Sequence, residues 1–212
     1  NKTSTIAPYG LGIEMEAGKP GWNDALNGLP GMLGAGVSEL YELKRLLNQL
    51  NVSDFSSESH VSLPKEAGIF IENLSNVLTS HGDKKLDLTL WKKITEVREA
   101  YRASILNGIT DERFTCSIKQ ALNKIRIMSQ IVDQAIQAVE SFREDLVPTY
   151  FYFEAEFSPE EKTVTKITPH AVLPFLEGIV KQMKLANDVD VARSIYEKVK
   201  QSDLYDNKLG MY

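Results

Sequence analysis

The residues whose types and spacing point to chemistry lie in one short run, residues 14–31, with the sequence EMEAGKPGWNDALNGLPG. Glycine and proline interrupt helices and strands, so this run predicts a loop, and loops on a rigid scaffold often carry binding and catalytic groups. The ring of Trp22 offers a flat apolar platform beside carboxylates and amides. That combination suits a sugar, which has C–H faces and a rim of hydroxyl groups.

Asp24 is the candidate catalytic residue of the run. Cleavage of a glycosidic bond requires a carboxylic acid that protonates the leaving oxygen, and this acid needs a raised pKa and a fixed position beside the sugar. A carboxyl next to a tryptophan ring, on a loop restrained by Pro20 and Pro30, can meet these needs. The alternative is that Asp24 only caps the turn over 25–28.

Residues 21–27 (GWNDALN), followed by 34–39 (GAGVSE) and a predicted helix, resemble glycoside hydrolase family 94. That family comprises the cellobiose, chitobiose and β-oligoglucan phosphorylases. Its motif is Gly-Asp-Trp-Asn-Asp-Gly-Met-Asn, followed by a Gly-x-Gly-x-Ser segment that starts a barrel helix. The specific match covers about the first fifth of the chain.

The resemblance implies a mainly α fold, a portion of an (α/α)6 barrel of paired antiparallel helices. It also implies inverting phosphorolysis of a β-glucoside or β-gluco-oligosaccharide, which gives α-glucose 1-phosphate. Asp24 stands at the position of the general acid, and Trp22 at that of a tryptophan that contacts the sugar. Inorganic phosphate is then a co-substrate, and no cofactor is implied.

The chain departs from the family motif at Gly21, where the family has a sugar-binding aspartate. We expect other polar residues of the run to supply this contact. The predicted substrate-binding residues are Trp22, Asn23, Glu14, Glu16 and Lys19.

Two other functions remain open on the sequence. An inverting hydrolase on the same barrel would use water as nucleophile, with Glu14 or Glu16 as the base. A non-catalytic helical interaction module would use residues 115–143 as a docking arm.

Gly34 and Gly36 either cradle phosphate at a helix start or permit a tight turn.

Composition excludes several classes of partner. The net charge is −5 and the pI is about 5.3, so the chain lacks the basic character of a nucleic-acid binder. The histidines have no ligand spacing, so we expect no metal site. Cys116 is the only cysteine, and no apolar run approaches the ~20 residues of a membrane span. We therefore expect a cytoplasmic protein, and the family resemblance implies that it binds a β-linked oligosaccharide and phosphate.

The pattern of apolar residues predicts the organisation of the chain. We expect an active-site loop region over 1–37, a helical region over 38–148, a small β element over 149–168 and a second helical region over 169–212. Apolar stripes indicate helices at about 38–50, 64–81, 88–106, 115–143, 172–185 and 189–201. The alternation around Phe151 and Phe153 indicates a half-buried strand.

These helices are about half of those in a closed barrel, and the chain does not begin with Met. We therefore expect a fragment of a longer polypeptide. Its open apolar edges would be covered by the remainder of that polypeptide or by a second copy in a homodimer.

Overall fold

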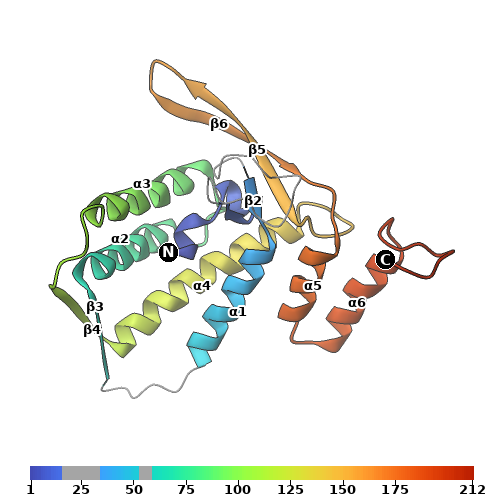
Figure 1. Cartoon of the computed structure of the whole chain (residues 1–212), viewed down its shortest axis with the longest axis horizontal. Coiled ribbons are helices and arrows are strands. Elements are labelled where there is room, and N and C mark those ends of the chain that lie inside the picture. The colour runs from blue at the N-terminus through green and yellow to red at the C-terminus, as the bar shows by residue number, and fades with distance from the viewer. Residues whose placement is uncertain (16–33, 53–58) are drawn as a thin grey trace.

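The computed structural model describes residues 1–15, 34–52 and 59–212 (Figure 1). Two short 3₁₀ helices, η1 (Lys2–Thr5) and η2 (Pro8–Gly10), open the chain. The α-helices of the described ranges are α1 (Ser38–Val52), α2 (Lys65–His81), α3 (Leu88–Ser104), α4 (Ile118–Glu140), α5 (Leu176–Leu185) and α6 (Val189–Lys200).

The helices lie side by side in one row. α2 packs against α3 and α4, α4 against α1, α1 against α5, and α5 against α6. In Figure 1 the row is open, with α3 and α6 at its opposite ends. The two central helices run antiparallel, because Tyr41 near the start of α1 bonds to Glu140 at the end of α4, while Lys44 bonds to Asp133 further back along α4.

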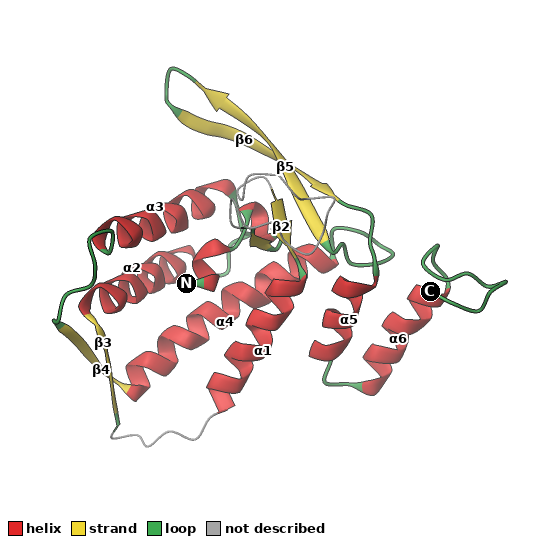
Figure 2. Ribbon diagram, in the orientation of Figure 1, coloured by secondary structure: helices red, strands yellow, loops and turns green. Residues whose placement is uncertain are grey.

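Two antiparallel sheets accompany the helices (Figure 2). The larger sheet has the order β1-β2-β5-β6, and the smaller one pairs β3 with β4. The strands are β1 (Ile13–Glu14), β2 (Gly34–Gly36), β3 (His60–Pro64), β4 (Arg113–Ser117), β5 (Tyr150–Ser158) and β6 (Thr163–Ala171). Beyond β2, the β5–β6 hairpin projects away from the helices (Figure 2).

The expected portion of an (α/α)6 barrel is wrong. Such a barrel pairs inner and outer helices around a ring, whereas these helices form an open row with two antiparallel sheets, so the described chain is a mixed α and β structure. The β element predicted over 149–168 is part of a sheet that also contains β1 and β2. An amphipathic stripe identifies the buried face of a helix but not the element that covers it, which is why the arrangement was mispredicted.

The individual helices lie close to the predicted ranges, and their ends have local causes. α1 begins at Ser38 and α2 is followed by Gly82, as predicted. Gly82 has a φ of 62°, a left-handed conformation that favours glycine after a helix. Asp87 caps α3 by accepting from the Leu90 N–H at 2.7 Å, and Ser117 begins α4 in a capping box with Gln120.

Strand β5 follows the predicted alternation only in part. Phe151 and Phe153 are buried and Tyr152 is exposed, as predicted. Tyr150 is buried as well, because its ring stacks on Phe175 just before α5. The predicted buried face ends at Phe153: Ala155, which precedes the bulge between Glu156 and Phe157, is already exposed, and Phe157 is 59% exposed.

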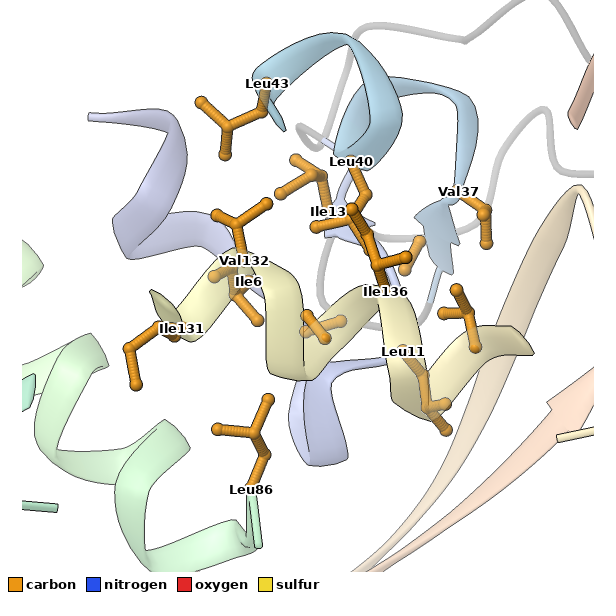
Figure 3. Close-up of a cluster of buried hydrophobic side chains, with 14 of the residues drawn as sticks. Ile6, Leu11, Ile13, Val37, Leu40, Leu43, Leu86, Ile131, Val132 and Ile136 are labelled. Carbon is orange, nitrogen blue, oxygen red and sulfur yellow. The ribbon is translucent and has the colours of Figure 1, made fainter. Parts of the chain in front are cut away.

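The core lies where the N-terminal segment crosses between α4, α1 and the residues before α3 (Figure 3). α4 is an internal helix, with Val132, Ala135 and Val139 fully buried. Gly10 approaches α4 so closely that a Cβ there would lie 3.1 Å from the Ala135 Cα and would clash with Leu86. The labelled members of this cluster are Ile6, Leu11, Ile13, Val37, Leu40, Leu43, Leu86, Ile131, Val132 and Ile136.

Candidate functional site

Of the predicted site residues, only Glu14 lies in the described part of the chain. Trp22, Asn23, Asp24, Glu16 and Lys19 lie in 16–33, outside the described residues, so their roles stay predictions. Glu14 lies in strand β1 and is described. The division of the chain into a loop region and helical regions of one catalytic domain likewise stays a prediction.

Both ends of the segment 16–33 attach to the larger sheet. Glu14 pairs with Ala35, and the Met15 N–H donates to the Gly34 carbonyl at 3.0 Å. On its other side, β2 pairs with β5, where Gly34 lies opposite Tyr152. The chain therefore leaves the sheet after β1 and rejoins it at the neighbouring strand β2, which pairs with β5. These positions define the candidate site.

Glu14 is a buried carboxylate with two protein partners. The Trp91 indole Nε1 donates to one of its oxygens at 2.5 Å, and Arg98 Nη1 donates to the other at 2.8 Å. The side chains of Glu14 and Arg98 are only 10% and 11% exposed. The same Arg98 nitrogen donates to the Ser4 carbonyl at 2.7 Å, so this group ties β1, α3 and η1 together.

Burial raises the pKa of the Glu14 carboxyl, and the Arg98 charge together with the Trp91 and Arg98 hydrogen bonds opposes this rise without cancelling it. A cavity of about 280 Å³ borders the group and is also lined by Lys2, Tyr101 and Arg102. Each carboxylate oxygen already accepts one hydrogen bond from a protein group, and the side chain is only 10% exposed, so Glu14 is held mainly by protein partners. Its predicted role in substrate binding stays a prediction, and the geometry favours a structural one.

The opposite face of the sheet carries exposed polar and aromatic groups. Residues directly across an antiparallel pair share one face, so Tyr152, Gly34 and His170 lie together, while Glu14 lies on the other face. The Tyr152 and His170 rings stack with centroids 4.7 Å apart and an interplanar angle of 12°. Glu154, the next residue on this face of β5, brings Oε2 to 3.3 Å from the His170 Nε2.

Tyr150 and two acids occupy the inner end of the same face. The Tyr150 hydroxyl donates to Glu177 Oε2 at 3.3 Å. Burial raises the pKa of this hydroxyl, and the charges of Glu177 and Glu39 add to the rise. A Cβ at Gly36 would clash with the Glu39 carboxylate. That carboxylate occupies the space that a phosphate cradle at Gly36 would need, so the glycine permits close packing rather than anion binding.

Sequence reasoning missed most of these groups. His170 was considered only as a metal ligand, and the partners Trp91 and Arg98 of Glu14 were not singled out. The alternation in β5 did predict that Tyr152 points outward, whereas its pairing with His170 depends on a strand register that no local signal fixes.

No protein-family model and no curated protein matches this chain. The resemblance to glycoside hydrolase family 94 therefore rests on residues 21–39 alone. Within the described ranges, His, Cys, Asp and Glu side chains do not gather in groups of three that could hold a metal ion. None of the helices described combines the length and apolar character needed to cross a bilayer.

Proposed function

We propose that this chain contributes the general acid and part of the sugar site of a β-glucoside phosphorylase. The observation that carries the proposal is the run GWNDALN at 21–27 followed by GAGVSE at 34–39. The described part of that run supports it, because α1 begins at Ser38, the serine at which the resemblance implies a helix start. The neighbouring face of the sheet offers an aromatic ring and a carboxylate, as sugar binding requires.

In the proposed reaction, the Asp24 carboxylic acid protonates the glycosidic oxygen as inorganic phosphate attacks the anomeric carbon from the opposite side of the sugar. The bond to the leaving sugar breaks, the new bond joins carbon to a phosphate oxygen, and the configuration inverts. Trp22 stacks on the sugar, and Asn23, Glu16 and Lys19 bind hydroxyl groups. Phosphate is itself the nucleophile, so the reaction needs no second carboxylate to activate water.

The contacts of Glu14 favour phosphorolysis over the hydrolytic alternative that uses Glu14 as base. A general base must reach the attacking water within hydrogen-bond distance. The Glu14 oxygens instead accept from Trp91 and Arg98 in a position that is almost closed to solvent. This argument leaves Glu16, which lies outside the described residues, as the base of that alternative.

We place the activity in the cytoplasm. The product of phosphorolysis is an anionic sugar phosphate, and a charged molecule crosses the apolar part of a bilayer only at a high cost in free energy. Phosphorolysis inside the cell therefore retains its product, and the cytoplasm supplies the phosphate.

The test uses the full-length protein that contains this chain. With a β-gluco-oligosaccharide and phosphate, Asp24→Asn should lower kcat by about 10²–10⁴-fold, the usual contribution of a general acid. The matched control is Asp111→Asn, which makes the same change at an exposed position and should keep the wild-type rate. Wild-type turnover in a folded Asp24→Asn protein would contradict the proposal and favour an interaction module.

A further inference from the structure

The face of β5 and β6 that carries Tyr152 is partly exposed to solvent beyond Tyr150, which contacts Phe175 and Glu177. The Tyr152 residue is 38% exposed, and the Glu154 side chain is 71% exposed. The stacked His170 ring covers one face of the tyrosine ring, and among the described residues no second ring stacks on its opposite face. An aromatic ring that is already ordered loses little conformational entropy when a ligand stacks on it.

The polar groups around this ring form few hydrogen bonds with the described residues. The His170 Nε2 lies 3.3 Å from a Glu154 oxygen, but the two atoms do not have the geometry of a hydrogen bond. The Tyr9 hydroxyl donates to the Ile167 carbonyl at 2.9 Å. Within the described residues, the Tyr152 hydroxyl has no such hydrogen bond. A ligand rich in hydroxyl groups can donate to Glu154 and accept from Tyr152.

The position of this face connects it with the proposed reaction. Tyr152 lies opposite Gly34, the first described residue after the segment that contains Trp22 and Asp24. Paired residues of antiparallel strands have Cα atoms about 4.5–5.5 Å apart, so Tyr152 adjoins the point where that segment rejoins the sheet. Glycine contributes no side chain there, so the strip of β2 beside the tyrosine carries only backbone.

We propose that Tyr152, with Glu154 and His170, forms an additional sugar subsite for β-gluco-oligosaccharides, away from the bond that is cleaved. One sugar ring stacks on the face of Tyr152 opposite His170, and its hydroxyl groups bond to Glu154 and to the tyrosine hydroxyl. The inference rests on the proposed function and adds the substrate class, since such a subsite favours oligomers over the shortest β-glucosides.

The test compares short and long acceptors in the synthetic direction, with α-glucose 1-phosphate as donor and the full-length protein. Tyr152→Ala should lower kcat/KM about three- to tenfold for the longer oligomers, which corresponds to the contribution of one aromatic contact. The kcat/KM for the shortest acceptor should stay within about twofold of wild type, because that acceptor does not reach the subsite. Tyr152→Phe keeps the ring and should retain most of the preference for long acceptors.

The matched control is Phe157→Ala, which removes an exposed aromatic ring from the same strand beyond the bulge. It should leave the preference for acceptor length unchanged. An equal loss for short and long acceptors in Tyr152→Ala, or no loss for either, would overturn the subsite and leave the proposed phosphorolysis standing.

A second measurement separates the two proposals if the wild-type protein does not catalyse phosphorolysis. Calorimetry with cello- and laminari-oligosaccharides measures binding without turnover. Binding that weakens about three- to tenfold in Tyr152→Ala supports the subsite although the reaction is wrong. Equal binding by both proteins, or no binding by wild type, overturns the subsite.

Discussion

The polar groups on the two faces of the larger sheet differ in burial and in hydrogen bonding. Glu14 on one face is buried and both of its oxygens have partners, whereas Tyr152, Glu154 and His170 on the other face are more exposed and only partly bonded. A buried charge without partners costs several kcal/mol, so the loss of one Glu14 partner should strongly destabilise the fold. The exposed Tyr152 and Glu154 side chains carry no such cost and remain available to a ligand. One face of the sheet therefore contributes to stability, and the other offers groups for binding.

The largest expected effect is on the buried face. Arg98→Ala should lower the free energy of unfolding by about 3–5 kcal/mol at neutral pH, because it leaves the Glu14 carboxylate buried with only Trp91 as partner. Denaturant unfolding of the full-length protein measures this loss. The control is Arg102→Ala, since Arg102 is 56% exposed, forms an ion pair with Glu99 and acts on Glu14 only through the smallest of the charge effects on that carboxyl, so its loss should stay below about 1 kcal/mol. Equal losses in the two variants would contradict the contrast.

The pH dependence of the same variant sharpens the comparison. Burial holds the folded-state pKa of Glu14 above its ordinary value of 4.5, so the folded protein binds this proton more tightly than the unfolded chain. The contribution of Glu14 to stability is therefore greatest below pH 4.5 and falls as the pH rises from there through the folded-state pKa. Removal of the Arg98 charge raises that pKa further.

We therefore expect the stability deficit of Arg98→Ala to be smaller at pH 4 than at pH 7. Unfolding curves of wild type and variant at both pH values, with Arg102→Ala alongside, measure the difference. A deficit that is the same at both values, or larger in acid, would show that the Glu14 charge is not the cause.

The smallest expected effect on stability is on the open face. Tyr152→Ala should lower the free energy of unfolding by no more than about 1 kcal/mol, because it removes one cross-strand contact with His170 from a half-exposed position. The measurement is again denaturant unfolding, with Phe157→Ala as the comparison. A loss as large as that of Arg98→Ala would mean that Tyr152 belongs to the core and would remove the basis for the subsite.

The helices were predictable because each carries its own signal. Apolar residues at helical spacing marked α1 and α4, and Gly82 marked the end of α2. The pairing of β3 with β4 was not predictable, since their residues lie about fifty positions apart and each strand is mostly exposed or half-buried. The row of helices was not predicted for a similar reason, because an apolar stripe on a helix does not show which element packs against it.

The candidate site shows the same limit. Residue type alone made Glu14 a plausible sugar ligand, but its partners Trp91 and Arg98 come from a helix 77 and 84 positions away. The predicted β element ended at residue 168, before His170, so the contact between Tyr152 and His170 could not be foreseen. The sequence showed which residues could bind a sugar by their type. It did not show whether a polar residue lies on a buried or an exposed face, because that depends on the register of the sheet.

The most direct test of the central claim is the product of the wild-type reaction. The full-length protein is incubated with a β-gluco-oligosaccharide with and without inorganic phosphate, and the anomeric signals of the products are followed by NMR. We expect α-glucose 1-phosphate at early times, formed only when phosphate is present. Release of free glucose at the same rate without phosphate would identify a hydrolase, and no turnover of any β-glucoside would contradict the catalytic account altogether.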